Sequence, residues 1–538
     1  MKRIYYFLRA FIIPLCFISL HYGNNASKVA FRDILVSLLF VLILSCLIFG
    51  ILKAITKSLE KAILLSYIFF FLFFNYDNFA GVMFNSLITN QGISSTLLDH
   101  QKTRFLCAIL LAIMFGILAY LLSTKKNAEE SYQKFNNIFS IGMIIIVLGS
   151  LGFRSFLNSS RSSELSSDSI FPQWQQTLAS EDNLIHPADQ LPDIYYIILD
   201  GYGRKDVLKE YYDFDNASFL DSLANLGFGI SPDSLANYKQ TDLSFSSLLN
   251  MDYINWVGDQ VGGQNSSYFP LYYLIDHNRV FNQLHRAGYR IDTFATGFTA
   301  TEIDTANMIF RPKFYPNNYE NLLIKATPLS LFWDSWLNDL HRDRIRYGLQ
   351  NLAKAGNQDG PDFVFLHVFA PHPPFVFGPN GEDIDPDHPY STFDAAEFLE
   401  FGTAEEYKTG YIDQVTYVNK EILAAIQEIL QTSSVPPIII IQGDHGPGLE
   451  FDHQNLEKSN LAERYPILYA YFIPCGKNNP ILQDITPVNS FRYIFNACFN
   501  GNLPYLENRQ YFSSNLTPYK LVDVTDLLRE ELETEKKE

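Results

Sequence analysis

Two patterns of hydrophobic and polar positions divide the chain near residue 154. Before it, long apolar segments alternate with short polar loops, and after residue 193 short apolar runs alternate with amphipathic stretches. A helix needs about 20 apolar residues to cross a bilayer, and alternating strands and helices are typical of a covered parallel sheet. The sequence therefore predicts an N-terminal transmembrane α-helical bundle, followed by an α/β domain with a mostly parallel central sheet and helices on both faces.

The first part contains five apolar segments that we interpret as membrane crossings. They lie near residues 4–21, 34–52, 62–83, 105–122 and 137–153. The third is interrupted by polar residues at 75–78, and the fifth is short and contains three glycines. A cleaved signal peptide is the alternative for the first segment, and the later apolar segments count against it.

The loops between these segments predict their orientation. Lysines and arginines gather before the first segment and in the second and fourth loops, and the other two loops hold fewer. By the positive-inside rule, the N-terminus is cytoplasmic. An odd number of crossings then places everything after Arg154 outside the cytoplasm.

Charge separates the two parts as well. Residues 1–154 hold 14 of the 40 lysines and arginines but only 6 of the 58 aspartates and glutamates, so the rest of the chain is strongly acidic. An acidic domain argues against nucleic acid as a partner, because phosphate backbones select basic surfaces. Residues 155–169 are rich in serine and cannot bury a core, which is typical of a tether. We divide the chain into a transmembrane domain (1–154), a Ser-rich linker (155–190), the α/β domain (191–480) and a C-terminal extension with a charged tail (481–538).

Candidate chemistry centres on residues 438–446, which read Ile-Ile-Ile-Ile-Gln-Gly-Asp-His-Gly. Four β-branched residues predict a strand buried on both faces, and it ends in the ligand types Asp444 and His445. The run at 194–199 repeats this design and ends in Asp200. Sites in open α/β sheets lie at such strand ends, where one cation can hold two carboxylates together. The alternative for Asp200 is an ordinary turn or capping residue.

Thr241 stands where an extended segment gives way to a short predicted helix. A hydroxyl at a helix N-terminus beside a divalent cation loses its proton more easily, which suits a nucleophile. The alternative is that Thr241 is only an N-cap residue. Ser244 and Ser246 are rival hydroxyls, and position before the helix favours Thr241.

Histidines supply the remaining candidates. His367 and His372 lie at the exit of a further predicted strand, on either side of a Pro-rich turn, and His453 follows in a polar loop. Each could be a structural histidine, and two within six residues favour a site role for at least His372. Arg311 follows a candidate strand and could bind a phosphate with both guanidinium nitrogens.

Cysteines give little guidance. Three of the five lie in apolar segments, which leaves Cys475 and Cys498 in the second part. They could form one disulfide outside the cytoplasm or remain unpaired core residues.

Together these residues resemble the alkaline phosphatase superfamily, specifically the membrane branch with lipoteichoic acid synthases (phosphoglycerol transferases) and phosphoethanolamine transferases. Asp200 matches the first acidic metal ligand, Thr241 the nucleophile, and Asp444-His445-Gly446 the metal motif. The run from His367 to His372 matches the segment whose second histidine meets substrate phosphate or a second metal, and His453 matches a later site histidine approximately. The segment at 464–467 resembles the one that follows the metal motif in sulfatases.

The resemblance implies a sulfatase-like catalytic domain outside the inner (plasma) membrane of a multi-pass protein. Its metal ligands would be Asp200, Thr241, Asp444 and His445, around one divalent ion: manganese, zinc or magnesium. Thr241 would accept a phospholipid head group, phosphoglycerol or phosphoethanolamine, as phosphothreonine and pass it to an envelope glycan or lipid. His367, His372, His453 and Arg311 would contact the substrate.

Two departures limit this resemblance. The Cys-x-Pro-x-Arg type motif of sulfatases is replaced by Gln-Thr-Asp-Leu-Ser, which disfavours sulfate esters as substrates. Phosphoethanolamine transferases hold their soluble domain with several disulfides, and this chain can form at most one there, which favours the phosphoglycerol transferases as the nearer analogy. The alternatives are an extracytoplasmic phosphodiesterase, phosphatase or sulfatase-like hydrolase, and a scaffold, against which the intact motif residues argue. Residues 375–407 are either a wall that keeps water from the intermediate or a plain surface excursion.

Overall fold

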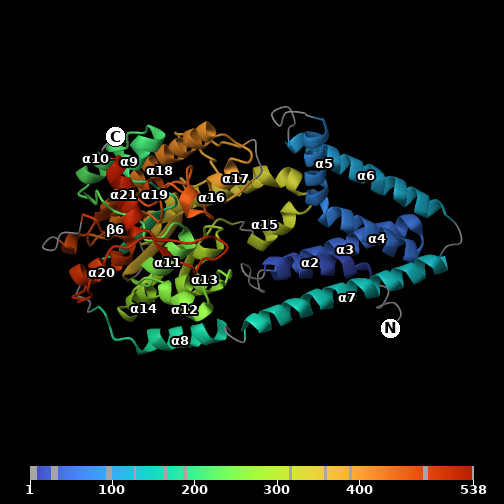
Figure 1. The fold of residues 1–538 in the computed structure, drawn as a ribbon, viewed down its shortest axis with the longest axis horizontal. Coiled ribbons are helices and arrows are strands. Elements are labelled where there is room, and N and C mark those ends of the chain that lie inside the picture. Colours follow the sequence, from blue (N-terminus) through green and yellow to red (C-terminus); the bar gives the residue numbers. More distant parts are fainter. Residues whose placement is uncertain are drawn as a thin grey trace. The chain divides into compact units, whose positions relative to one another are not determined.

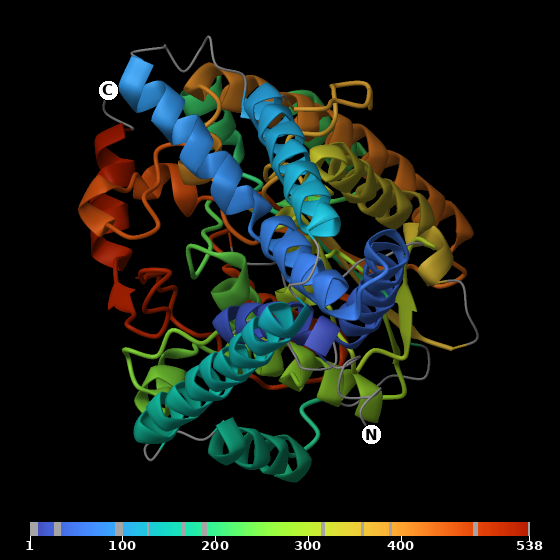
Figure 2. The same ribbon diagram turned by 90° about the vertical axis from the view of Figure 1, so that its right-hand side faces the viewer.

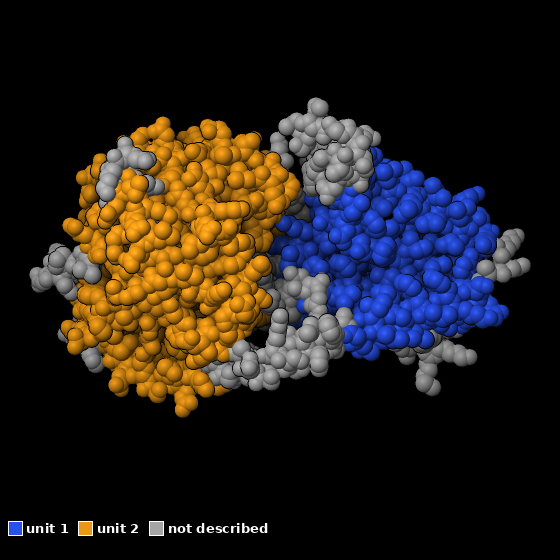
Figure 3. Space-filling model, in the orientation of Figure 1, with its two compact units in different colours: residues 1–163, 316–336 blue, residues 164–315, 337–538 orange. Residues whose placement is uncertain are grey.

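The computed structural model divides into two compact units, which are described separately (Figure 3). Unit 1 comprises residues 1–163 and 316–336, and unit 2 comprises 164–315 and 337–538. The sequence did not predict that 316–336 would group with the apolar helices. The residues that the structure describes are 9–25, 34–91, 100–125, 129–162, 167–185, 191–313, 318–356, 360–386, 390–476 and 483–535.

Unit 1 is helical. Its helices are α2 (Ile12–Asn25), α3 (Leu35–Thr56), α4 (Leu59–Phe74), α5 (Tyr76–Gln91), α6 (His100–Thr124), α7 (Glu129–Ser162) and α15 (Asn318–Lys325), and the unit boundary falls within α16 (Ser330–Ala355). Figures 1 and 2 show α7 as one long helix from two sides. Among the described residues, α3 and the stretch Thr103–Thr124 of α6 are long and apolar enough to span a membrane. A third span results if α4 and the start of α5, bent by 57°, count as one. The five predicted crossings therefore stay a prediction.

A buried polar contact joins α4 to α7 within unit 1. The Glu60 carboxylate accepts hydrogen bonds from Arg9 Nη2 at 2.7 Å and from Asn136 Nδ2 at 2.9 Å. Tyr67 and Ser140 join the same two helices at 2.7 Å. Because a buried carboxylate is costly without partners, this network fixes which faces of the helices meet.

A seven-stranded sheet forms the centre of unit 2. Its order is β2 (Gly229–Ile230), β7 (Tyr469–Phe472), β6 (Ile438–Gly443), β1 (Ile194–Leu199), β5 (Asp362–Val368), β3 (Arg290–Phe294) and β4 (Met308–Phe310). β1, β3, β4, β5 and β6 run parallel, and β7 is antiparallel to both neighbours. Every residue of β1 and β6 is buried, including Gln442, and the apolar runs in both strands predict this burial.

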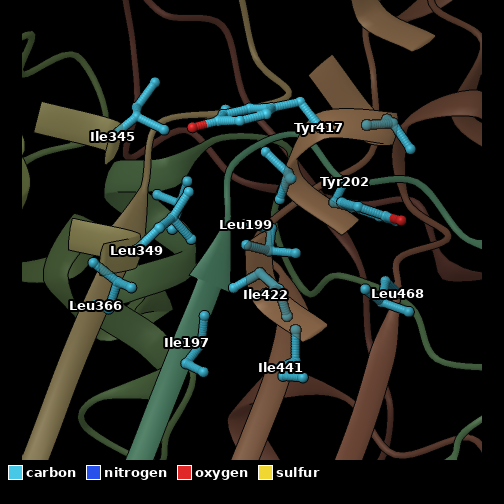
Figure 4. Close-up of a cluster of buried hydrophobic side chains, with 14 of the residues drawn as sticks. Ile197, Leu199, Tyr202, Ile345, Leu349, Leu366, Tyr417, Ile422, Ile441 and Leu468 are labelled. Carbon is cyan, nitrogen blue, oxygen red and sulfur yellow. The ribbon is translucent and has the colours of Figure 1, made fainter. Parts of the chain in front are cut away.

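Alternate residues of β1 build the two halves of the core. Ile197 and Leu199 pack with α16 and with α18 (Ala404–Thr432), through side chains such as Leu349 and Ile422 (Figure 4). Tyr196 and its alternating neighbours pack on the other face, with α11 (Thr241–Leu248), α14 (Arg279–Arg286) and α20 (Pro487–Cys498). The sheet is therefore covered on both faces, as predicted.

The remaining elements of unit 2 lie around this sandwich. They are the helices α8 (Ser167–Ser180), α9 (Lys205–Tyr212), α10 (Ala217–Asn225), α12 (Asn255–Val261), α13 (Phe269–Asp276), α17 (Ala395–Phe398), α19 (Leu461–Arg464) and α21 (Thr525–Glu535), short 3₁₀ turns at Thr299–Thr301, Leu456–Lys458 and Pro474–Gly476, and the strand pair β8 (Tyr511–Phe512) and β9 (Val522–Asp523). Cys475 and Cys498 form a disulfide with 5.3 Å between their Cα atoms, which settles the pairing that the sequence left open.

Candidate active site

Three neighbouring strands bring polar side chains to one edge of the sheet. β1 ends immediately before Asp200, β6 ends before Asp444 and His445, and β5 carries His367 near its end. β1 lies between β5 and β6 and runs parallel to both, so the residues that follow these strands meet at the carboxyl edge. His445 Nε2 lies 3.6 Å from Asp200 Oδ1 and 3.4 Å from Asp444 Oδ2.

Thr241 joins these residues from the N-terminus of α11. The backbone is extended at Gln240, and the helix begins at Thr241, as the sequence predicts. Gln240 occupies the N-cap position, so the alternative of Thr241 as an N-cap residue is wrong. Thr241 Oγ1 lies 3.3 Å from His445 Nε2. The hydroxyl therefore faces the same point as the two carboxylates.

The rival hydroxyls are engaged elsewhere. Ser244 Oγ donates to the carbonyl oxygens of Tyr238 at 3.3 Å and Asp444 at 3.0 Å. Ser246 Oγ donates to the carbonyl oxygens of Asp242 at 2.7 Å and Leu271 at 3.2 Å. Of the three candidates, Thr241 presents its hydroxyl to His445.

The donor set fits a divalent cation. Donor atoms of Asp200, Asp444 and His445 lie within 4.8 Å of one another, and all three residues are buried. Asp200 Oδ1 and Asp444 Oδ2 accept no hydrogen bond within the described structure, which is costly for buried carboxylate oxygens. Burial, and then the charge of Asp200, raises the pKa of Asp444 to about 6. Two carboxylates this close need a positive charge between them to stay ionised together.

Hydrogen bonds orient the histidine of this set. His445 Nδ1 lies 2.9 Å from the Gly446 carbonyl oxygen. A carbonyl only accepts, so Nδ1 carries the proton and Nε2 offers its lone pair toward the carboxylates. Burial, and then the charge of Arg464, lowers the pKa of His445, so the ring stays neutral, as a metal ligand must be.

Gly446 is required by a close approach of the chain. Its N–H donates to the Arg464 carbonyl at 2.6 Å, and a Cβ at this position would lie 2.5 Å from the Glu463 carbonyl oxygen. Only glycine therefore fits between His445 and the segment that brings Arg464 to the site.

A second group of side chains, all of basic residue types, lies beside the metal ligands and is called the basic cluster below: Lys239, His372, His453 and Arg464. Arg464 Nη2 lies 3.4 Å from His445 Nε2, and its Nε donates to the Lys239 carbonyl oxygen at 2.8 Å. Lys239 Nζ lies 3.2 Å from His453 Nδ1. The backbone N–H of His372 donates to the backbone carbonyl oxygen of Asp200 at 3.0 Å, which holds this histidine at the end of β1.

Asp394 lies among these groups. Its Oδ2 is 2.6 Å from Arg464 Nη1, 3.7 Å from His453 Nε2 and 4.0 Å from His372 Nε2. Burial alone would raise the pKa of Asp394, but the charge of Arg464 lowers the pKa well below its ordinary value. The carboxylate is therefore ionised inside the site.

Sequence reasoning missed three of these residues. Lys239, Asp394 and Arg464 were not predicted as site residues, although all three are buried at the site. Arg464 follows the Asp-His-Gly motif in a recognisable segment, and that was the one available signal. Asp394 is one of several aspartates in 375–407, and nothing in the sequence distinguishes it from the others.

The predicted substrate-binding residues fall in different places. His372 and His453 belong to the basic cluster. His367 lies behind Asp200, with Nε2 3.0 Å from Asp200 Oδ2 and Nδ1 3.1 Å from Thr301 Oγ1. Both ring nitrogens are thus engaged, and the histidine orients a carboxylate; its predicted contact with substrate stays a prediction.

Arg311 follows β4, the strand at the edge of the sheet, and its side chain is exposed. Three strand spacings separate β4 from β1, roughly 14 Å. Within the described part of the chain we find no contact between Arg311 and the site, and Arg464 is the guanidinium that lies there. A role for Arg311 with phosphate stays a prediction.

Comparisons with known proteins give structural matches only. No family model and no curated protein matches the chain. The C-terminal periplasmic domain of EcEptC from Escherichia coli is similar over 64% of this chain and 94% of that one, with 13% identity and a TM-score of 0.41, and a complex of that domain with Zn is also similar. Lipooligosaccharide phosphoethanolamine transferase A, an integral membrane protein from Neisseria meningitidis, is similar over 86% of this chain and 88% of that one, with 13% identity and a TM-score of 0.32. The phosphonate monoester hydrolase of Agrobacterium radiobacter is similar over 60% and 80%, with 12% identity and a TM-score of 0.36.

The structure is similar to phosphoethanolamine transferases and related hydrolases. Phosphoethanolamine transferases are one of the two kinds of enzyme that the motifs resemble. At identities this low the likeness concerns the fold, so reaction and substrate are argued below from the site residues.

Proposed function

We propose that the protein is a membrane-anchored, metal-dependent transferase that moves a phospholipid head group, phosphoglycerol or phosphoethanolamine, to a cell-envelope glycan or lipid. The observation that carries this proposal is the position of the Thr241 hydroxyl, 3.3 Å from His445 Nε2 and at the start of α11. A hydroxyl held beside two buried carboxylates and a neutral histidine has the surroundings of an activated nucleophile.

Asp200, Thr241, Asp444 and His445 would hold one divalent ion, and manganese, zinc and magnesium all suit this mixture of oxygen and nitrogen donors. When bound, the ion would supply positive charge that lowers the pKa of the Thr241 hydroxyl and draws electrons from the phosphoryl oxygens. His367 orients Asp200, and the Gly446 carbonyl orients His445.

The reaction has two halves. In the first, Thr241 Oγ attacks the phosphorus of the donor lipid; the Oγ–P bond forms, the P–O bond to diacylglycerol breaks, and the hydroxyl proton ends on the diacylglycerol oxygen. In the second, an acceptor hydroxyl attacks the same phosphorus, the Oγ–P bond breaks, and the acceptor proton returns to Thr241. His372 donates through Nδ1 to the Pro373 carbonyl at 2.7 Å, so Nε2 faces the cluster and suits the relay of these protons. Arg464 and His453 would stabilise the charge on the phosphoryl oxygens.

Membrane attachment suits this substrate. We propose five crossings, a cytoplasmic N-terminus and an extracytoplasmic catalytic unit in the inner (plasma) membrane, with outer-leaflet phospholipid as donor. An anchored enzyme meets its lipid donor at high local concentration, whereas a soluble one must extract it. The Cys475–Cys498 disulfide supports the extracytoplasmic location, because such bridges persist in oxidising compartments.

Hydrolysis is the second candidate function. An extracytoplasmic phosphodiesterase or phosphatase would use the same Thr241 and pass the phosphoryl group to water. Thr241 in place of a formylglycine precursor disfavours a sulfatase, and the buried, assembled donor set disfavours a scaffold without catalysis.

Mass spectrometry of the full-length protein tests the proposed function. After incubation with phosphatidylglycerol or phosphatidylethanolamine vesicles and no acceptor, we expect a peptide containing Thr241 to gain the mass of the corresponding phosphorylated head group. The donor that produces the adduct identifies the head group. An adduct on another residue, or none with either lipid while turnover continues, contradicts a phosphothreonine intermediate.

Reporter fusions test the topology. A reporter active only outside the cytoplasm is expected to be active when fused after Ser169 and inactive when fused after Lys126, because Lys125, Lys126 and Lys134 mark a cytoplasmic loop. The measurement is reporter activity per fusion protein, quantified by immunoblot. The opposite pattern removes outer-leaflet lipid as the donor.

A further inference from the structure

An ionised carboxylate lies among the side chains that the proposed function places around the phosphate. Asp394 Oδ2 lies 2.6 Å from the Arg464 guanidinium and within 4.0 Å of the Nε2 atoms of both His372 and His453. The proposed function assigns Arg464 and His453 to the phosphoryl oxygens and His372 to the relay of protons. Asp394 therefore neutralises Arg464 before any substrate arrives.

Asp394 is held in place from behind. Its Oδ1 accepts from the Tyr407 hydroxyl at 2.8 Å and from the Ala395 N–H at 2.8 Å, at the start of α17. Phe398 of α17 packs against Phe375 and Tyr407, with ring centroids 5.4 Å apart in each pair. Both Asp394 oxygens thus have partners, and α17, which begins at the next residue, is anchored in the core. The carboxylate is a fixed part of the site.

We propose that Asp394 restricts the site to phosphodiesters, which carry one negative charge, and excludes phosphate monoesters, which carry two. This inference rests on the proposed function and names its substrate class more narrowly. A diester phosphate has two non-bridging oxygens and one negative charge. The ion and the histidines can bind these oxygens, although Asp394 has already neutralised the charge of Arg464. A monoester has a third such oxygen and is largely a dianion at neutral pH, and its extra charge would face the Asp394 carboxylate in a site of low dielectric.

The proposed cycle agrees with this restriction. The donor lipid, the head group linked to Thr241 and the transferred product are all phosphodiesters with one negative charge. A phosphatase, in contrast, must bind a dianionic monoester as its substrate. Asp394 therefore favours a transferase or a phosphodiesterase over a phosphatase. The metal ligands alone do not distinguish these candidate functions.

Two soluble probes test the inference on purified full-length protein: bis(para-nitrophenyl) phosphate, a diester, and para-nitrophenyl phosphate, a monoester. The wild type is expected to have the larger kcat/KM on the diester. Asp394→Asn is expected to shift the ratio of the two kcat/KM values toward the monoester by about 10-fold or more, because one unit charge near the substrate is removed. Inhibition by inorganic phosphate is expected to strengthen in the same variant.

Asp394→Ser is the second variant, because Asn and Ser both cap a helix start and so keep α17 in place without the charge. Asp385→Asn is the matched control, because it removes a carboxylate that also lies within residues 375–407 but is exposed and bonded to Arg342 at 2.8 Å. It is expected to leave the ratio of the two kcat/KM values unchanged. The same change in kcat/KM on both probes would assign Asp394 a structural role and overturn the inference, as would a wild type that prefers the monoester.

The two proposals fail separately. If Thr241 carries the adduct but the ratio of the two kcat/KM values is unchanged in Asp394→Asn and Asp394→Ser, the proposed transferase is supported and the role of Asp394 in excluding monoesters is contradicted. If the ratio changes as expected but no adduct forms on Thr241, the role of Asp394 is supported and the phosphothreonine mechanism is contradicted.

Discussion

Replacing Thr241 by Ala is expected to lower head-group transfer by about 1,000-fold or more, in line with the loss of other catalytic nucleophiles. The reason is geometric: of the candidate hydroxyls, Thr241 Oγ1 faces His445 Nε2, and those of Ser244 and Ser246 donate to backbone carbonyls. The measurement is transfer from a fluorescent phospholipid by the full-length protein in detergent. The variant is expected to keep part of its metal, because Asp200, Asp444 and His445 remain.

Two matched variants make this result specific. Thr241→Ser keeps a hydroxyl at the helix start and is expected to retain measurable turnover. Ser246→Ala removes a neighbouring hydroxyl that points to the Leu271 carbonyl and is expected to keep its rate. Turnover by Thr241→Ala at the wild-type rate, or loss of the covalent adduct in Ser246→Ala alone, would contradict the assignment.

The parts of the site that the sequence predicted are those fixed by local pattern. Asp200 directly follows a run of apolar residues, and Asp444 follows a run of four isoleucines after Gln442 and Gly443; such runs define both a buried strand and its end. Thr241 stands at a change from extended to helical pattern, which is also local. Because parallel strands end at one edge of a sheet, these three positions could be placed together before their contacts were known.

The basic cluster depends on contacts between distant segments, which no local pattern encodes. Asp394 and Arg464 are 70 residues apart in sequence, and both lie against Gly448 in the segment that follows β6. Arg311 and Arg464 both stand near predicted strands, and only Arg464 lies in a segment like the one that follows the metal motif in sulfatases. The sheet order separates them, since Arg311 follows the edge strand β4. The antiparallel direction of β7 was likewise not available, because an apolar run does not encode its direction.

Residues 375–407 also contribute a charged side chain to the site, which the sequence did not predict. The sequence offered a wall of scattered aromatic residues or a plain surface excursion. Phe375, Phe398 and Tyr407 pack on one another, and the Tyr407 hydroxyl donates to Asp394. The aromatic residues therefore position a charge, which neither sequence interpretation included. The wall stays a prediction.

Asp444→Ala and His445→Ala are each expected to weaken divalent-ion binding by about 100-fold or more, since even residues that only orient ligands contribute about 10- to 100-fold. The physical reason is the shared point between Asp200, Asp444 and His445, whose donor atoms lie within 4.8 Å of one another. The measurement is bound manganese, zinc or magnesium per protein, by elemental analysis after dialysis at fixed free-ion concentration. Thermal unfolding of the same samples checks that each variant is folded.

A gradient of variants separates ligands from their surroundings. His367→Ala is expected to weaken binding less than Asp444→Ala, because His367 contacts the Asp200 carboxylate at 3.0 Å and acts on the ion through it. Arg311→Ala, at the far edge of the sheet, is expected to bind as the wild type does. Full metal content in both Asp444→Ala and His445→Ala would place the ion elsewhere and leave the orphaned Asp200 and Asp444 oxygens without an explanation. Loss of metal in these two variants, with a smaller loss in His367→Ala, is the pattern that a cation held between the ends of β1 and β6 requires.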